Sequence, residues 1–335
     1  MKNSIFRIPY DDLCDIADSI HTHLDEFRGK TFLLVGGTGF LGKWVFGALI
    51  FINNKFNLKI KIIVVTRSIK NLLAKYPEIS KYDFIELVES DITNMNEKFS
   101  SDFVFYAASD VTDEFIKNKK LMEKTIIDGT DNLLNSIDLT KIRSFTHISS
   151  GAVNNYLIDN AKTEVNNYGR CKYLAERKII QTGEKNSFTT QNLRCYTFIG
   201  PLMPLNTHFA AGNFLSNALK GEDISINGDG SPLRSYLYTS DFSSFVLKSF
   251  FLENSNDFDI GSNEVISILD LAKKITNVSD KQIELIVKSQ KQKILKINKY
   301  LPNTDKMGEL NLVPRISLNE ALRKTSNFYK EINHL

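Results

Sequence analysis

The chain has 335 residues, of which 42% are apolar and 24% are charged, and its formal net charge at pH 7 is +3. This length exceeds the roughly 250 to 300 residues at which one hydrophobic core usually stops growing, so two linked lobes are expected. Lysines and arginines are spread along the chain without long runs, which argues against a nucleic acid or a membrane as the partner.

The cysteines and the apolar segments predict a cytoplasmic protein. The cysteines are odd in number and show no close pairing pattern, which is typical of reduced thiols; they are Cys14, Cys171 and Cys195. Residues 1–20 include acidic side chains where a signal peptide needs an apolar core. The longest apolar run, residues 44–52, is far shorter than the roughly 20 residues that span a bilayer.

In chain order, apolar positions at helical spacing over residues 11–28 first predict a short extra helix. Apolar, β-branched segments then predict strands at 31–36, 59–67, 84–89, 102–108, 144–150 and 188–198. Helical patterns lie between most of them, notably at 40–54, 114–137 and 169–182. Strands that alternate with helices imply βαβ units, so the predicted fold class is α/β with a doubly wound parallel sheet.

The sequence pattern changes after residue 199, where segments rich in Gly, Pro and Asn replace the regular alternation of strand and helix patterns. Residues 256–262 look like one more strand that returns to the first lobe, so the lobes are expected to be interleaved. The expected organisation is a helical extension, a first domain and a smaller α+β lobe. Their ranges are 1–28, then 29–198 plus about 236–262, then about 199–235 plus 263–335.

A cluster of glycines follows the first predicted strand and opens the first predicted helix, in the segment LLVGGTGFLG. Such a turn presents unpaired N–H groups and the positive end of a helix dipole to an anion such as a pyrophosphate. The spacing permits either Gly36, Gly39 and Gly42 or Gly37, Gly39 and Gly42, and does not decide between them. A bare glycine turn is the alternative, but this position is that of the Rossmann-type dinucleotide fingerprint.

Two later positions indicate which nucleotide is bound. The second strand ends in Arg67, where an NAD site usually carries an acidic residue for the ribose hydroxyls. A guanidinium can bind the extra phosphate of NADP, with Thr66 and Ser68 adding hydroxyl donors, or it can be an ordinary surface arginine. Asp91, just past the third strand, is placed to accept a hydrogen bond from adenine or to cap a turn. The sequence thus favours NADP(H), with NAD(H) also possible.

A second motif, YGRCK, opens the helical pattern that starts at residue 168. The i, i+4 spacing places Tyr168 and Lys172 on one face of a helix. A nearby ammonium favours the phenolate of a tyrosine, so Tyr168 becomes a usable proton donor and acceptor. The preceding strand ends in Ser149 and Ser150, whose hydroxyls can face the cofactor. The Tyr/Lys spacing is a weak signal alone and a strong one together with the glycine turn.

With these motifs the chain resembles the extended short-chain dehydrogenase/reductase family, in its group of nucleotide-sugar epimerases, dehydratases and reductases. The resemblance begins near residue 30 and covers nearly the whole remaining chain. The segments that carry it are GGTGFLG, SDIT, FYAAS, SSGAV, YGRCKYLAE, LRCYTFIGP, NGDGSPLRSYLYTSDF and FDIGSNEVISILDLA.

The resemblance implies an NADP-binding first domain, a nucleotide-sugar-binding lobe and three catalytic residues: Ser150, Tyr168 and Lys172. Ser150 matches rather than Ser149 because it directly precedes the Gly-Ala pair. The expected cofactor contacts, from the residues and the resemblance together, are Gly36, Thr38, Gly39, Phe40, Leu41, Gly42, Thr66, Arg67, Ser68, Asp91, Ile92, Ala107, Ala108, Tyr168 and Lys172. The expected substrate contacts are Ser109, Ser150, His208, Phe209, Asn213 and, at the diphosphate, Arg234. No metal ligand is expected.

Two departures from the family pattern bear on the reaction. The 4,6-dehydratases of the family carry an acidic pair directly after the catalytic Ser or Thr, where this chain has Gly151 and Ala152. Neither side chain can move a proton. The usual Tyr-Gly that follows is replaced by Asn154 and Asn155, which puts the local contacts of the active site in doubt.

The expected activity is NADP(H)-dependent oxidoreduction at C4 of a nucleotide-diphosphate sugar, as a 4-keto reductase in deoxysugar or surface-polysaccharide biosynthesis. One alternative is a 4-epimerase that recycles its cofactor internally. Another is a 4,6-dehydratase that recruits Asp110, Asp113 or Glu114 as its acids, and a third is a non-catalytic NADP-sensing protein. The resemblance also implies a homodimer in which the helices at 114–137 and 169–182 pair with their copies.

Overall fold

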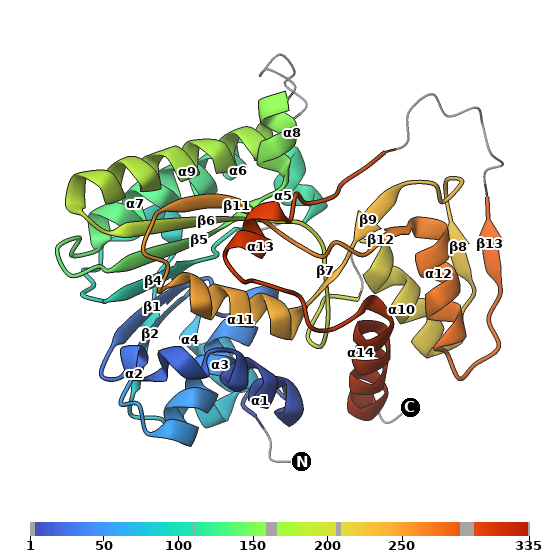
Figure 1. Ribbon diagram of the computed structural model, residues 1–335, viewed down its shortest axis with the longest axis horizontal. Coiled ribbons are helices and arrows are strands. Elements are labelled where there is room, and N and C mark those ends of the chain that lie inside the picture. Colours follow the sequence, from blue (N-terminus) through green and yellow to red (C-terminus); the bar gives the residue numbers. More distant parts are fainter. Residues whose placement is uncertain (1–3, 110–111, 159–165, 206–208, 289–297, 334–335) are drawn as a thin grey trace. The chain divides into compact units, whose positions relative to one another are not determined.

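The computed structural model describes residues 4–109, 112–158, 166–205, 209–288 and 298–333 (Figure 1). The chain divides into two compact units. We call residues 1–195 together with 243–258 the first unit, and residues 196–242 together with 259–335 the second unit.

A seven-stranded sheet forms the centre of the first unit, in the order β11-β6-β5-β4-β1-β2-β3. Its strands are β1 (Thr31–Val35), β2 (Lys61–Thr66), β3 (Ile85–Glu89), β4 (Phe103–Tyr106), β5 (Ser144–Ser150), β6 (Thr189–Cys195) and β11 (Asn256–Ile260). The pairs from β3 to β6 are parallel. This is the strand order of the Rossmann-type fold, extended by β11, so the predicted α/β fold class is confirmed.

Helices cover both faces of this sheet. They are α1 (Tyr10–Ser19), α2 (Leu24–Phe27), α3 (Phe40–Phe56), α4 (Ile69–Lys75), α5 (Asp113–Lys117), α6 (Lys119–Glu123), α7 (Gly129–Ser136), α8 (Ala152–Ile158), α9 (Asn167–Asn186) and α11 (Thr239–Ser249). Figure 1 shows α7 and α9 on one face and α3 and α4 on the other.

The core of the first unit follows from the alternation of side chains along buried strands. On β1, Leu33 and Val35 pack into the apolar cluster that includes Leu133 of α7 and Ile179 of α9. Phe32 points to the opposite face, where its ring stacks on those of neighbouring phenylalanines. Because both faces are covered, the strands read as continuous apolar runs in the sequence.

The segment before β1 is part of this packing. Phe6 and Ile8 are buried, and a Cβ added at Gly47 of α3 would come within 2.7 Å of the Ile8 side chain. A glycine in the middle of α3 therefore lets the N-terminal segment lie close against that helix.

The region 114–137, expected as one helix, is interrupted. Asn118 ends α5 and caps α6, its Oδ1 accepting a hydrogen bond from the Leu121 N–H at 3.1 Å. A π-helical turn at Lys124–Asp128 then leads into α7. The turn brings Gly129 against Ile92, where an added Cβ would lie 2.9 Å from the isoleucine side chain. The expectation of one regular helix was wrong, because asparagine capping and this close contact override the helical pattern.

The second unit consists of short strand pairs and helices. Its strands are β7 (Phe198–Ile199), β8 (Ile224–Ile226), β9 (Leu233–Ser235), β10 (Leu237–Tyr238), β12 (Val265–Ser267) and β13 (Leu285–Val287), paired as β7 with β10, β8 with β13 and β9 with β12. Its helices are α10 (Ala210–Lys220), α12 (Ile268–Asn277), α13 (Asp305–Glu309) and α14 (Leu318–Asn333). Within the described ranges of the whole chain, no helix is both long and apolar enough to cross a membrane.

Candidate active site

The turn after β1 brings two backbone segments into contact at the point where the strand order reverses. Gly36 has a φ of +94°, and a Cβ there would lie 2.5 Å from the carbonyl carbon of Ala107, which follows β4. A Cβ at Gly42 would lie 2.1 Å from the Gly36 carbonyl oxygen. A Cβ at Gly37 would meet only a side chain, at 3.0 Å. The packing therefore requires glycine at 36 and 42, and favours the register that begins at Gly36.

The same turn opens α3 and leaves its first amide groups without a side-chain cap. Gly39 is the N-cap residue, and Lys43 N–H donates the first helical bond to its carbonyl at 2.9 Å. Thr38, Phe40 and Leu41 lie half-buried around it. A cradle of backbone N–H groups, with no room for side chains at its base, fits the pyrophosphate of a dinucleotide.

The ends of β2 and β3 carry the residues expected near the adenosine. Thr66 is buried and Arg67 is exposed, while the Ser68 hydroxyl oxygen accepts the Asn71 N–H at 3.2 Å and so caps α4. Asp91 Oδ1 accepts both the N–H and the hydroxyl of Thr93, each at 2.8 Å. These bonds, with a smaller contribution from Arg67, lower the pKa of Asp91. Asp91 Oδ1 thus caps the turn at Thr93, and the role of Asp91 towards adenine stays a prediction.

The segment that follows β4 lines the other side of the glycine turn. Ala107 N–H donates to the Val35 carbonyl at 2.7 Å, which extends the contact of β4 with β1, and Ser109 N–H turns back to the Ala107 carbonyl at 3.0 Å. Ala107, Ala108 and Ser109 are half-buried, and Ile92 is buried beneath the end of β3.

The two serines that end β5 have different partners. Ser149 Oγ donates to Glu176 Oε1 at 2.5 Å in the buried interior. Ser150 Oγ accepts the Ala152 N–H at 3.2 Å, at the start of α8. An accepting hydroxyl still has its proton to donate, so this arrangement favours Ser150 over Ser149 as the hydroxyl that faces a substrate.

A pair of tight contacts holds the start of α9 against the start of α8. Asn166 caps α9, because its Oδ1 accepts the Gly169 N–H at 3.0 Å, and its Nδ2 donates to the Ala152 carbonyl at 2.9 Å. A Cβ at Gly169 would lie 2.3 Å from the same carbonyl oxygen. Tyr168, between the cap and this glycine, is thereby held at the strand end that carries Ser150.

Lys172 lies one helical turn further along α9 and is buried. Its Nζ donates to the Ile148 carbonyl of β5 at 2.9 Å. Burial lowers the pKa of this amine to about 8, an effect that Cys195, Glu176 and Cys171 partly oppose. The amine therefore titrates near neutral pH, and the groups around it decide which fraction is protonated.

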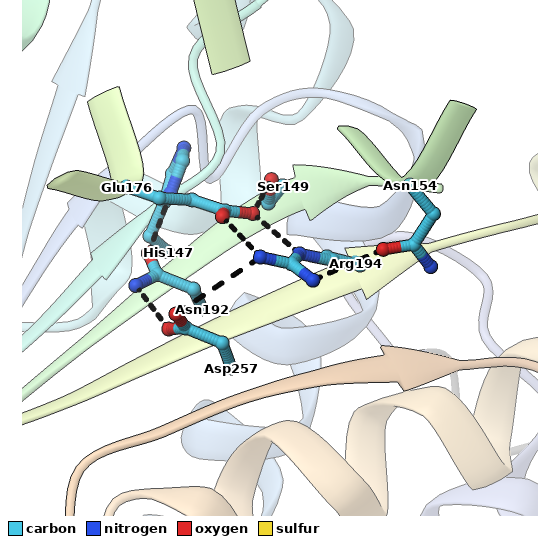
Figure 2. A network of polar contacts seen from close by, with 7 residues as sticks. All are labelled: His147, Ser149, Asn154, Glu176, Asn192, Arg194 and Asp257. Carbon is cyan, nitrogen blue, oxygen red and sulfur yellow. Dashed lines mark hydrogen bonds and ion pairs between the residues drawn. The ribbon is translucent and has the colours of Figure 1, made fainter. Parts of the chain in front are cut away.

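Sequence reasoning missed a buried polar network beneath these residues (Figure 2). It joins α9, β5, β6, α8 and β11 through His147, Ser149, Asn154, Glu176, Asn192, Arg194 and Asp257. One signal was present in the sequence, since Glu176 follows Lys172 at the same i+4 spacing by which Lys172 follows Tyr168. No comparable pattern in the sequence predicts Arg194, which the register of β6 against β5 brings to Glu176.

The expected substrate residues of the second unit are only partly described. His208 lies outside the described residues, and Phe209 is exposed directly before α10. Asn213 of α10 lines a cavity of about 280 Å³ in this unit. Arg234 of β9 donates to Asn298 Oδ1 at 3.1 Å, and its guanidinium lies 5.9 Å from the centre of the Tyr300 ring.

The lining of this cavity mixes amides, a hydroxyl, glycines and apolar side chains. It consists of Ala210, Asn213, Phe214, Asn217, Ser225, Ile226, Asn227, Gly228, Gly230, Pro232 and Ile268. A largely apolar hollow with a few convergent polar groups is typical of a small-molecule site.

A doubly wound sheet with a glycine turn after its first strand, and a Tyr/Lys pair on the helix after β5, defines an enzyme of the short-chain dehydrogenase/reductase type. Residues 32–261 match the family described as the NAD dependent epimerase/dehydratase family, and the chain belongs to this family.

Similar proteins include enzymes with different named activities. A trifunctional UDP-glucose 4,6-dehydratase/UDP-4-keto-6-deoxy-D-glucose 3,5-epimerase/UDP-4-keto-L-rhamnose-reductase of Arabidopsis thaliana is 25% identical over 332 residues, which cover 91% of this chain and 48% of that protein. The chain thus spans about half the length of this relative.

Among solved structures, UDP-glucose 4-epimerase of Thermotoga maritima with UDP-glucose has a TM-score of 0.72 at 20% identity, and the match covers 90% of this chain and 99% of that one. The Bordetella bronchiseptica enzyme WbmF with NAD+ has a TM-score of 0.71 at 17% identity, covering 92% and 94%. At these identities the likeness shows a common fold.

We expect Gly42→Ala to destabilise the first unit, because its methyl group would lie 2.1 Å from the Gly36 carbonyl oxygen. Overpacking of this kind costs about 1 to 3 kcal/mol of unfolding free energy. Gly39→Ala in the same turn is the matched control, since its Cβ would lie at an ordinary 3.5 Å from the same oxygen. Denaturant unfolding of both variants measures the difference, and equal losses would contradict the steric assignment.

We also expect dinucleotide binding to weaken as the pH rises through about 8, because Lys172 loses its ammonium form above a pKa lowered to about 8 by burial. If only the ammonium form binds, the affinity falls roughly tenfold for each further pH unit. Calorimetric titration across this range measures the effect. Lys172→Arg, which stays charged, should show no such fall, and a flat wild-type profile would contradict the role of the ammonium.

Proposed function

We propose that the protein is an NADP(H)-dependent oxidoreductase that acts at C4 of the sugar in a nucleotide-diphosphate sugar, in the direction of 4-keto reduction. The observation that carries this proposal is the contact of β5 and the segment after Ser150 with the start of α9, which bears Tyr168 and Lys172: Asn166 Nδ2 donates to the Ala152 carbonyl at 2.9 Å, and Lys172 Nζ donates to the Ile148 carbonyl at 2.9 Å. The glycine turn of the same unit fits a pyrophosphate. The relatives add support, since the named activities of the Arabidopsis protein include a UDP-4-keto-L-rhamnose-reductase.

Each of the three residues has a role that its surroundings allow. Ser150 donates a hydrogen bond to the C4 oxygen and polarises the carbonyl. Tyr168 donates its hydroxyl proton to that oxygen, and Lys172 binds the nicotinamide ribose and favours the phenolate that remains. The reduced dinucleotide supplies a hydride to C4. The carbonyl thereby gains a hydride and a proton and becomes an alcohol, and Tyr168 regains its proton from water.

The second unit would hold the nucleotide end of the substrate. The cavity beside α10 offers Asn213, Asn217 and Asn227 as donors and acceptors for a base, with Phe214 and Ile226 as apolar walls. Arg234 offers a guanidinium for the diphosphate, and Asn298 and Tyr300 restrict its orientation. A bound sugar nucleotide is consistent with the T. maritima neighbour, whose structure contains UDP-glucose.

The preference for NADP(H) rests on Arg67 at the end of β2, where the guanidinium is exposed and available to a phosphate. Asp91 nearby holds Thr93 through its Oδ1, and it lies after the third strand, whereas the acidic residue of an NAD site usually stands at the end of the second. The WbmF neighbour contains NAD+, so a protein of this fold can bind NAD+, and in this chain the side chain at position 67 would decide between the two dinucleotides.

We expect Arg67→Ala to weaken NADP binding much more than NAD binding. A charge-assisted contact to the 2′-phosphate contributes about 1.5 to 3 kcal/mol, which is roughly a 10-fold to 150-fold loss of affinity. Fluorescence titration of wild type and variant with both dinucleotides measures it. Lys70→Ala, an exposed cation on the neighbouring helix α4, is a matched control for net charge. Equal losses for both dinucleotides would remove Arg67 from this role.

We expect wild-type protein to oxidise NADPH when a 4-keto sugar nucleotide is added, and Tyr168→Phe to abolish this, because the ring remains without its transferable proton.

We expect no 4,6-dehydration of nucleotide hexoses, because a positioned acid or base contributes about 10² to 10⁴-fold each and Gly151 and Ala152 provide neither. Spectrophotometry at the NADPH band and product chromatography measure the two reactions.

The alternatives give different results in the same assays. A 4-epimerase interconverts nucleotide hexoses without net NADPH consumption, and a sensing protein binds NADP without turnover. A dehydratase forms the 4-keto-6-deoxy product, and loss of that product on replacing Glu114, which is exposed on α5, would overturn the reductase proposal. Asp110 lies outside the described residues.

A further inference from the structure

The strand register of β5 and β6 places two polar side chains on one buried carboxylate. Ser149 pairs with Arg194 across the two parallel strands, and both reach Glu176 of α9. Arg194 Nη2 lies 2.8 Å from Glu176 Oε2, and its Nε lies 3.1 Å from Oε1. Only 1% of the Glu176 side chain is exposed. The carboxylate is therefore held by a two-pronged ion pair and a hydroxyl, away from water.

Glu176 lies on the same helical face as the two residues of the proposed mechanism. Tyr168, Lys172 and Glu176 follow one another at i, i+4 and i+8, about 12 Å along the helix from first to last. Because Glu176 is bonded to β5 and to β6, α9 can neither rotate nor slide on the sheet without breaking these bonds. Figure 2 shows Arg194 lying between Glu176 and Asn154.

Asn154 connects this ion pair with the segment after Ser150. Its Oδ1 accepts from Arg194 Nη1 at 3.0 Å, and α8, which carries it, begins two residues after Ser150. The asparagine that departs from the family pattern is thus the link from Arg194 to the active-site strand end.

Several other groups face the Lys172 amine. Cys171 on α9 and Cys195 on β6 are buried thiols. The Ile148 carbonyl of β5 accepts a hydrogen bond from the Lys172 amine. His147 of β5 is buried, and burial lowers its pKa well below the usual value, so the imidazole is neutral. Burial raises the pKa of Glu176, while Arg194 and Ser149 oppose that rise. Glu176 is thus the carboxylate among the groups that act on Lys172.

We propose that Glu176 is a positioning residue for the Tyr168–Lys172 pair: bonded to Arg194 and Ser149, it fixes the position of α9 on the sheet and places a carboxylate one helical turn from the buried Lys172 amine. The catalytic meaning of this role rests on the function proposed above. The positioning role of Glu176 does not require bound substrate or cofactor, so it is tested on the protein alone.

The test is a pH titration of the Lys172 side chain by NMR, using protein labelled with carbon-13 lysine and Lys172→Arg to assign the signal. We expect a wild-type midpoint near the pKa of about 8 and, in Glu176→Gln, a midpoint lower by about one unit. The amide keeps the shape of the carboxylate and one acceptor oxygen for Ser149, and it removes the charge together with the second acceptor, which receives the bond from Arg194 Nη2. Glu184→Gln, an exposed change two turns further along α9, is the matched control and should leave the midpoint unchanged.

A second variant covers the case in which Glu176→Gln does not fold, since it leaves Arg194 without its ionic partner. The double variant Glu176→Met and Arg194→Met replaces the whole buried pair by apolar side chains, a change that is often neutral for stability. Because it removes the positive charge of Arg194 together with the negative charge of Glu176, we expect it to lower the Lys172 midpoint by less than Glu176→Gln does. A midpoint within about 0.2 units of wild type in a folded variant would overturn the proposal.

A binding measurement connects this result with function while keeping the two proposals separable. In Glu176→Gln the affinity for the dinucleotide should begin to fall about one pH unit earlier than in wild type, with the KM for the sugar nucleotide unchanged. A purely structural loss would lower affinity equally at every pH, and would overturn the electrostatic role. Failure of wild type to reduce any 4-keto sugar would count against the proposed function alone, because the NMR midpoint does not depend on it.

Discussion

The burial of the Lys172 amine is the constraint on which the polar interior of the first unit depends. Removing an ammonium from water costs several kcal/mol. The hydrogen bond to the Ile148 carbonyl and the nearby Cys195, Glu176 and Cys171 offset this cost in part. Glu176 is buried in turn and requires Arg194. One charge beside the proposed reaction centre therefore requires a series of partners that continues, through Asn192 and Arg194, to β11.

The same unit depends on a second contact, between the glycine turn after β1 and the segment after β4. Gly36 lies so close to the Ala107 backbone that only main-chain atoms line the base of the turn before α3. Main-chain donors keep their geometry whatever the neighbouring side chains are. In the proposed cofactor site, strand order would set the anion cradle, and the side chains at the ends of β2 and β3 would set the dinucleotide preference.

The second unit is built differently. Its described strands pair two at a time, and its cavity is lined by one side of α10, the end of β8, the connection that follows β8 and the first residue of α12. Arg234 is oriented by Asn298 and Tyr300, which come from a segment more than 60 residues away in the chain. If this unit holds the substrate, as proposed, substitutions in its connections could change substrate choice while the proposed redox residues stay on the regular elements of the first unit.

The sequence by itself determined the α/β class, the strand and helix alternation, the glycine turn and the helical spacing of Tyr168 and Lys172, because these are local patterns with fixed periods. It predicted one helix over 114–137, where an asparagine cap and a π-helical turn against Ile92 interrupt the pattern. Only the tertiary structure chose between the two glycine registers, since the choice depends on the distance from Gly36 to a strand some 70 residues further along the chain.

The family pattern implied Ser150 rather than Ser149, and the tertiary structure added the different hydrogen-bond partners of the two serines. Tertiary structure alone assembled the network around Glu176. Neighbouring residues of a strand face opposite sides of the sheet, but which side meets a carboxylate is decided by the helix packed there. The pairing of β5 with β6 placed Arg194 opposite Ser149, and α9 supplied the acid that joins them. Such a long-range polar contact leaves no periodic trace in one sequence, because its members come from separate elements and are selected by burial.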